Sequence, residues 1–486
     1  FLQSDEFVEE QQRYVKVFDP VLGKMRYFLQ LRPLYGEASA PVRWESTLAA
    51  FLTKPEADGG CGFIRGSNER SVYWHPERKF SIMVYVDDIG CLALKSDAQW
   101  FYARLRARFN VKDPVWLEPG GIPIDYLGLS VAEDTIGHMY LSMEHYIETM
   151  FTVLFPNGKI GDHLDRKMER VNVPIFRPID EDSPALNAED EKFFRKALGM
   201  TGWVTLVLRY DAALAFSRIG QFAAKPNYSA LQSVTHLVHY LYYSRTLCLR
   251  QHRDSVGKWR TQSDSDLAGN TTFINRFRSQ MSWYTEVDRA LITFSSKVDP
   301  TVGSTVANWQ FQPAVANKGI ARSHPDISSA SVEIYAAANC VNDTLALTYV
   351  LEEAGIRYSM PINVEIDNAA AVSFIRSRGV TKSGLRHIDL RLSWVKTLHD
   401  SCLVNALKVS TIHNASDIGT KILDHQRFIW LRSRWYHAYP LYGGPQKLDY
   451  DKVLDSTPHV DDVQELVEQE LQELVVFSQR LRESVC

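Results

Sequence analysis

The chain has 486 residues, 45% of them hydrophobic and 23% charged, which is typical of a globular protein with two to four domains. Its net charge of −4 hides an acidic end, so a nucleic-acid surface would have to come from local clusters of basic residues. We find no apolar run of about 18 residues, no signal-peptide pattern and no C-x-x-C pair. The sequence therefore predicts no membrane span, disulfide framework or zinc ribbon, and it favours an intracellular location.

Two apolar segments joined by a pair of aspartates stand out in the first 150 residues. Residues 80–86 and 89–95 each predict a strand, so Asp87 and Asp88 are expected at the hairpin between them. Residues 96–99 have the pattern of a capping box. The predicted helix that follows has an apolar face made of Ala98, Phe101, Tyr102, Leu105 and Phe109.

Adjacent aspartates on a tight hairpin suit phosphoryl transfer by two metal ions. Mg²⁺ prefers oxygen ligands and is usually held by one or two carboxylates together with substrate phosphates. Asp87 and Asp88 are therefore candidate metal ligands and catalytic residues. The alternative is structural, because aspartates are common in turns, where they accept hydrogen bonds from the backbone.

The middle of the chain is expected to be helical. Residues 151–190 have little regular pattern and indicate a connection, whereas residues 190–250 follow a helical period. A helix starting at Asn227 would carry an apolar stripe of Leu231, Val234, Leu237, Val238 and Leu241. No catalytic cluster is visible here, so residues 151–257 are interpreted as a thumb or connection.

Alternating strands and helices indicate an α/β domain in residues 258–440. Strands are predicted at 258–263, 291–295, 362–366 and 403–410, and helices at 331–353, 369–375 and 387–398. Residues 441–486 form an acidic tail with an apolar stripe. This tail could be a dimerising helix or a solubilising end.

Four separated carboxylates in this domain form a second candidate site. Asp264 ends a predicted strand, Glu333 lies in the first turn of the long helix, Asp367 directly follows another strand, and Asp417 precedes a final helix. Metal-dependent nucleases of the ribonuclease H type use carboxylates that converge from separate elements. Each residue also has a structural alternative, such as an acid at a helix N-terminus.

The first 150 residues resemble the reverse transcriptase of Ty1/copia-type retrotransposons. The matching segments, in order, are Leu34-Tyr35-Gly36 with Ala40-Pro41 and Trp44, then Tyr85-Val86-Asp87-Asp88, then Tyr126-Leu127-Gly128. Residues 126–131 are expected to form one strand, with Leu127-Gly128 as the primer grip of that family. The family usually has Gln at the position of Ser39.

Residues 258–439 resemble the ribonuclease H of the same family. The matching segments are 263–269, Val332-Glu333-Ile334, Asp367-Asn368, Arg386-His387-Ile388-Asp389-Leu390-Arg391 and 416–421. His387 and Asp389 could lie near substrate or be structural. The helical block 195–251 also resembles the family, with Leu198-Gly199-Met200 and Phe216-Ser217-Arg218 at the expected places.

The resemblance implies a multi-domain α/β chain with an α+β palm, a helical connection and a ribonuclease H-like domain. It implies an RNA-directed DNA polymerase with Mg²⁺, or Mn²⁺, bound by Asp87 and Asp88 and, in the nuclease, by Asp264, Glu333, Asp367 and Asp417. The implied partners are RNA template, RNA–DNA hybrid, dNTPs and other parts of a polyprotein, in a cytoplasmic particle or the nucleus. The tail could support oligomers.

The family's third palm aspartate would lie about four residues before Phe1. We therefore expect no primer extension by the isolated 486-residue chain, and extension of a labelled primer on an RNA template would contradict this. Two alternatives remain open: a non-catalytic relic that binds nucleic acid, and a domesticated structural protein that assembles through its tail.

Overall fold

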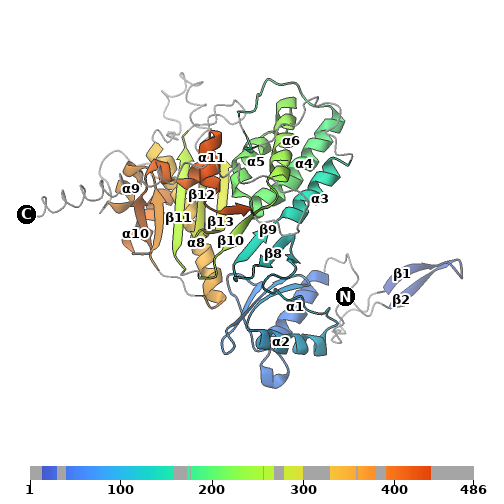
Figure 1. The fold of residues 1–486 in the computed structure, drawn as a ribbon. Coiled ribbons are helices and arrows are strands. Elements are labelled where there is room, and N and C mark those ends of the chain that lie inside the picture. Colours follow the sequence, from blue (N-terminus) through green and yellow to red (C-terminus); the bar gives the residue numbers. More distant parts are fainter. Residues whose placement is uncertain are drawn as a thin grey trace, which may run out of the picture. The chain divides into compact units, whose positions relative to one another are not determined.

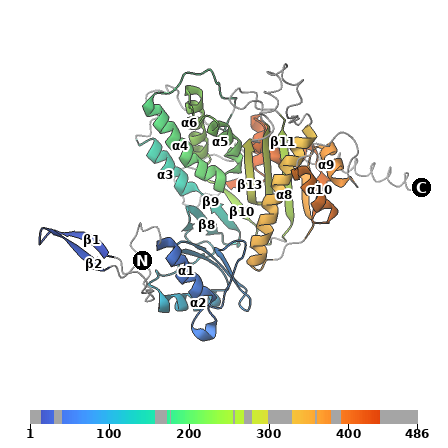
Figure 2. The same cartoon turned by 180° about the vertical axis from the view of Figure 1, so that it is seen from behind.

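The computed structural model describes residues 14–29, 40–156, 172–175, 177–254, 257–267, 279–298, 329–356, 360–377 and 390–438. The fold mixes helices with several small sheets, as expected for a multi-domain chain of the α/β class (Figures 1 and 2). The described residues group into two compact units. The first lies within residues 1–118, 124–128 and 341–362, and the second within residues 119–123, 129–340 and 363–486.

The first unit is built on a four-stranded antiparallel sheet. Its strands, in spatial order, are β3 (Ile64–Arg65), β4 (Val72–His75), β5 (Phe80–Tyr85) and β6 (Asp88–Leu92). The helices α1 (Ala40–Thr53) and α2 (Lys95–Arg108), the short strand β7 (Ile124–Tyr126) and the hairpin of β1 (Tyr14–Asp19) and β2 (Lys24–Leu29) also belong to it.

One face of this sheet carries the core of the first unit. Phe80 and Ile82 alternate along β5 and so point to the same face, where they are buried. Both helices contribute to this apolar cluster, whose buried residues are Leu48, Ala49, Leu52, Cys61, Phe63, Tyr73, Phe80, Ile82, Phe101, Leu105 and Phe109. The cluster anchors the hairpin that carries the two aspartates.

The predicted hairpin at residues 80–95 is confirmed, since β5 and β6 pair from Ser81↔Leu92 to Tyr85↔Asp88. The capping-box prediction is wrong. The helix α2 begins at Lys95, and the carbonyl of its N-cap residue Leu94 already accepts from the N–H groups of Asp97 and Ala98, so no capping box forms. Helix α1 was not expected from the sequence.

Residues 126–131 do not form one strand. Leu127 and Gly128 have φ angles of 54° and 80° and form a turn between β7 and β8 (Leu129–Glu133). Two successive positive φ angles are the pattern of a tight type I′ hairpin turn. The apolar alternation on both sides of the turn misled the prediction, because leucine rarely adopts a positive φ.

A five-stranded sheet forms the larger β-structure of the second unit. Its spatial order is β13 (Ala290–Val298), β12 (Gln280–Val287), β11 (Trp259–Asp266), β14 (Ile362–Ile366) and β15 (Val404–Lys408). β11 is antiparallel to β12 and parallel to β14. Four helices accompany this sheet: α8 (Ser329–Glu353), α9 (Ala369–Arg376), α10 (Leu390–Asp400) and α11 (His425–Arg432).

The predicted strands and helices of this region agree with the structure within a few residues, and β14 agrees at both ends. β12 was missed. Its sequence, Gln-Met-Ser-Trp-Tyr-Thr-Glu-Val, mixes polar and apolar residues, yet the first seven are buried. Because both faces of the strand are covered, the two-residue alternation that marks a half-exposed strand is absent.

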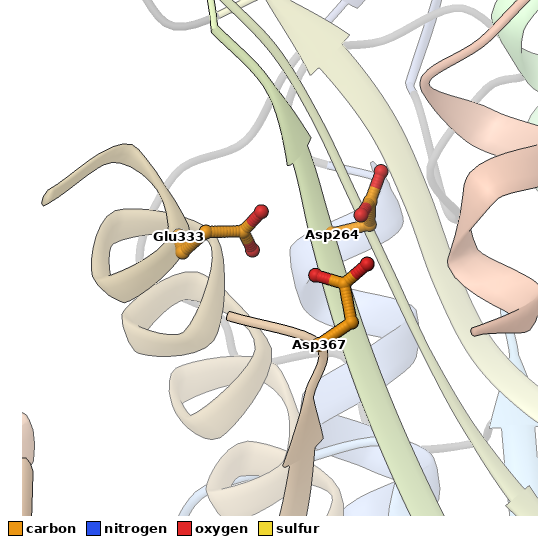
Figure 3. Close-up of side chains that lie close together, drawn as sticks. All are labelled: Asp264, Glu333 and Asp367. Atoms are coloured by element: carbon orange, nitrogen blue, oxygen red, sulfur yellow. The ribbon is translucent and has the colours of Figure 1, made fainter. Parts of the chain in front are cut away.

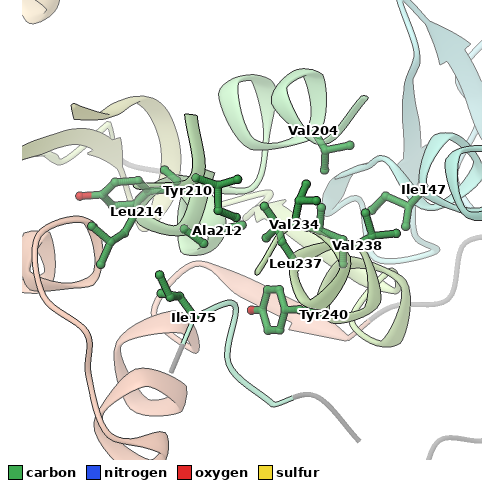
Figure 4. Close-up of a cluster of buried hydrophobic side chains, with 14 of the residues drawn as sticks. Ile147, Ile175, Val204, Tyr210, Ala212, Leu214, Val234, Leu237, Val238 and Tyr240 are labelled. Atoms are coloured by element: carbon green, nitrogen blue, oxygen red, sulfur yellow. The ribbon is translucent and has the colours of Figure 1, made fainter. Parts of the chain in front are cut away.

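The middle of the second unit is helical, as expected, and its core is shown in Figure 4. The helices are α3 (Glu144–Leu154), α4 (Ala188–Val207), α5 (Ala213–Gly220) and α6 (Tyr228–Tyr243). Asn227 caps α6 by accepting a hydrogen bond from the Ala230 N–H. A second sheet, in the order β16 (Tyr436–Ala438), β10 (Leu247–Gln251), β9 (Met139–Ser142) and β8, completes the unit.

A buried ion pair lies beside this helical core. The guanidinium group of Arg209 donates two hydrogen bonds to Asp211, of 2.9 and 2.8 Å, and both side chains are fully buried. Arg209 also donates to the carbonyl and the hydroxyl of Ser244, and Tyr240 donates to Asp211. Removing one partner of a buried pair leaves a charge without compensation.

We predict that Asp211→Ala lowers the free energy of unfolding by about 3–5 kcal/mol, because Arg209 would stay buried without its counter-ion. Urea unfolding followed by circular dichroism would measure the change. Asp182→Ala is the control: Asp182 is exposed, so the expected change is within about 0.5 kcal/mol. A similar loss in both variants would contradict the prediction.

Candidate metal centre of the second unit

Three of the four carboxylates expected in the nuclease-like region lie together. Asp264, Glu333 and Asp367 each offer an oxygen atom within 4.8 Å of the other two. Figure 3 shows Glu333 reaching from α8 toward Asp264 on β11, with Asp367 at the end of β14. Within the part of the chain that the structure describes, this is the one group of three or more potential metal ligands.

The strand register brings the two aspartates together. β11 and β14 are neighbouring parallel strands, with Ser263 opposite Ile366. Asp264 is the next residue within β11, and Asp367 directly follows the end of β14, so the two aspartates lie beside each other across this strand pair. Glu333 lies in the N-terminal part of α8, where its side chain is almost completely buried, with 5% exposed.

Asp264 is held by the segment that follows β15. The amide of Asn414 donates a 3.0 Å hydrogen bond to Asp264 Oδ1, and the hydroxyl of Thr420 donates to Oδ2. Asn414 and Thr420 are themselves buried. Lys421 places its Nζ atom 3.6 Å from Asp264 Oδ2. These contacts fix the orientation of a carboxylate that is only 1% exposed.

Burial makes the ionised form of this cluster unfavourable. Burial raises the pKa of Asp264 to about 8, against the opposing effect of Lys421 and with further contributions from Asp417 and Asp367. Burial, followed by the charges of Asp264 and Asp367, raises the pKa of Glu333 to about 9. Without a bound cation, burial therefore favours the protonated forms of Asp264 and Glu333.

A divalent cation fits this cluster. Three carboxylates supply the oxygen ligands that Mg²⁺ or Mn²⁺ prefers. The Oε2 atom of Glu333 is buried and has no hydrogen-bond partner among the described residues, which is unusual for a buried charged group. A bound cation would satisfy this atom and offset the burial, and the smaller effect of neighbouring carboxylates, that raise the two pKa values.

Asp417 lies beside the cluster but not in the group of three. It belongs to the short 3-10 helix Ala415–Gly419 and is 4% exposed. Lys421 forms an ion pair with Asp417, and Arg427 Nη2 lies 3.6 Å from Asp417 Oδ2. Lys421 therefore connects Asp417 to Asp264, and the fourth predicted carboxylate is partly neutralised by two cations.

The paired aspartates of the first unit occupy an exposed hairpin. Val86 and Asp87 form the turn, with Val86 at a φ of 57°, and Asp87 and Asp88 are both exposed. The indole N–H of Trp44 donates to the Val86 carbonyl, which ties α1 to the turn. Among the described residues, no third carboxylate forms a metal-holding group with this pair.

Several residues that shape these sites were not singled out from the sequence. Lys421 and Thr420 are part of the quoted segment 416–421, and Trp44 is part of an earlier one, so the motifs contained a signal. Asn414 had none. His387, Asp389, Ser39 and the acidic tail lie outside the described residues.

Comparison with known proteins identifies relatives over most of the chain. It is 25% identical over 430 residues to the retrovirus-related Pol polyprotein from transposon TNT 1-94 of Nicotiana tabacum. It is 24% and 23% identical over 414 residues to those from transposons RE1 and RE2 of Arabidopsis thaliana. These matches cover 83–84% of this chain but only 24–28% of each relative. No protein-family model matches the chain.

Among the described residues, the model contains no helix that combines the length and the apolar character needed to cross a membrane.

We predict that, without divalent cations, the protein becomes less stable as the pH rises from about 5 to about 9. An acid whose pKa is raised on folding contributes stability below its unfolded pKa, and this contribution is lost as the pH passes the folded values of about 8 and about 9. Asp264→Asn should flatten this dependence and raise the melting temperature at pH 9 in EDTA, as measured by thermal unfolding. A wild-type melting temperature that stays constant, or an unchanged slope in Asp264→Asn, would contradict the assignment.

Proposed function

We propose that this chain, a homologue of the Pol polyproteins of Ty1/copia-type transposons, is a reverse transcriptase and ribonuclease H region. The observation that carries the proposal is the group of Asp264, Glu333 and Asp367. It combines the ligands, the burial and the convergence from separate elements that metal-dependent cleavage of a phosphodiester requires. Cleavage of the RNA strand in an RNA–DNA hybrid is the activity we assign to it.

A divalent cation bound to these carboxylates would activate water and stabilise the charge that develops on the phosphate. The protein's own contribution is to hold the ligands still. Asn414 and Thr420 fix the two oxygens of Asp264, so the carboxylate does not have to reorganise when a cation binds. Lys421 keeps Asp417 beside Asp264 despite their like charges.

The first unit would supply the polymerase palm. Asp87 and Asp88 lie on a hairpin whose exposure leaves room for a primer end and an incoming dNTP, and Trp44 holds the turn from α1. We propose these two aspartates as metal ligands for nucleotidyl transfer on an RNA template. A further carboxylate would complete the site.

The arrangement along the chain follows from this assignment. We propose a palm within residues 1–150, a helical connection in 151–257, a ribonuclease H domain in 258–440 and an acidic tail in 441–486. The chain spans about a quarter of the length of its relatives, so other parts of a polyprotein are proposed partners. The proposed location is a cytoplasmic particle or the nucleus.

We predict Mg²⁺-dependent cleavage of an RNA–DNA hybrid by the chain and a loss of at least about a hundredfold in Asp264→Asn and in Asp367→Asn, since each removes a ligand charge. Gel analysis of a 5′-labelled RNA strand would measure it. The matched control is Asp182→Asn, which changes an exposed aspartate of the same unit and should cleave like the parent.

Two results would lead to other conclusions. Equal cleavage by the parent and the Asp264→Asn protein would reject these residues as the catalytic centre. Hybrid binding without cleavage in either Mg²⁺ or Mn²⁺ would favour a non-catalytic nucleic-acid-binding relic.

A further inference from the structure

A group of basic side chains gathers in the second unit, apart from the carboxylate cluster. We call it the basic cluster, and it comes from the β8–β9 turn, the end of β10, the β12–β13 turn and β16. Its members are His138, Arg250, His252, Arg253, Arg289 and His437.

The strand register and direct contacts hold the basic cluster together. On β10, Cys248 lies opposite His437 of β16 and Arg250 lies opposite Tyr140 of β9. Because residues two apart share a face of a strand, His437 and Arg250 lie on one face. The rings of His138 and His252 are in edge contact, with centroids 4.9 Å apart.

Hydrogen bonds show that two of the imidazoles act as acceptors. Arg250 Nη2 lies 2.9 Å from His252 Nε2, and an arginine can only donate. The backbone N–H of Arg253 donates to His138 Nδ1 over 3.1 Å. Burial, followed by nearby Arg250, His252 and Arg289, lowers the pKa of His437 to about 4. Burial, together with the neighbouring guanidinium groups, therefore favours the neutral forms of His252 and His437.

Carboxylates lie near this cluster, among them Asp134, Asp254 and Asp288, but none of them pairs directly with its arginines. Asp134 accepts from the N–H groups of Ile136, Gly137 and His138, and Asp288 accepts from the backbone N–H of residues 257 and 258. Within the described part of the chain, no carboxylate oxygen lies within 4.0 Å of a guanidinium nitrogen of Arg250, Arg253 or Arg289. The buried Nε–H of Arg250 also has no partner there.

We propose that the basic cluster binds phosphate groups of a nucleic-acid backbone. Arginine N–H groups donate well to phosphate oxygens, and a planar guanidinium group can donate two hydrogen bonds at once. Arg253 and Arg289 are exposed, so an anion can reach them from solvent. Arg250 is half-buried, so its contact with an anion would be partly shielded from water. The anion preference follows from these charges, whereas the choice of nucleic acid rests on the proposed function.

The test measures binding of a fluorescent RNA–DNA hybrid by anisotropy in EDTA, where cleavage cannot interfere. The double variant Arg253→Gln/Arg289→Gln changes two exposed side chains and should keep the wild-type melting temperature. We expect affinity at 0.1 M salt to fall by at least about tenfold and the slope of log K against log salt to drop by about 2. The control is Lys192→Gln/Arg195→Gln, which removes the same charge from exposed positions of α4.

An unchanged affinity, or an equal loss in the control, would overturn the proposal, because the effect would then be absent or a matter of net charge alone. The result is distinct from that of the cleavage assay. A chain that cleaves hybrid normally while the double variant binds like the parent would reject the basic cluster and leave the proposed nuclease intact. A cluster-dependent affinity in a chain without cleavage would support the cluster alone.

Discussion

Burial of Asp264 is the constraint on which the second unit depends. Removing a carboxylate from water costs several kcal/mol unless other groups compensate it. The fold brings Asn414, Thr420 and Lys421 back to β11 about 150 residues later in the chain. The short helix Ala415–Gly419 positions these groups, and Ala415 is fixed in turn by the side chain of Gln262 on the same strand. These later segments thus supply the hydrogen-bond donors and the positive charge that the buried carboxylate of Asp264 requires.

Local patterns in the sequence predicted the elements that obey simple periodicity. The apolar strand 362–366, the long helix ending near Gly355 and the capped helix after Asn227 all agree with the structure. The convergence of Asp264 and Asp367 could also be anticipated, since the sequence predicts each at the end of a strand, although β11 continues to Asp266. The fine placement of Asp417 could not, because it depends on ion pairs with residues four and ten positions later.

Other features are decided by tertiary contacts that no local pattern records. β12 is buried on both faces, so Ser282 and Thr285 pack where apolar residues would be expected. The start of α2 depends on backbone bonds to the Leu94 carbonyl. The basic cluster combines four segments that are far apart in the sequence. The overall composition, which gives a net charge of only −4, therefore does not reveal it.

The two charged groups of the second unit would have opposite effects on a phosphate backbone. In their ionised form, the carboxylates of Asp264, Glu333 and Asp367 repel phosphates until a cation is bound. The basic cluster attracts phosphates without any cation. If the basic cluster and the carboxylates act on one hybrid, binding does not require a metal ion whereas cleavage does. Binding and cleavage then respond differently to salt and to divalent cations. Raised salt weakens the first, because it screens exposed arginines, and removal of divalent cations abolishes only the second.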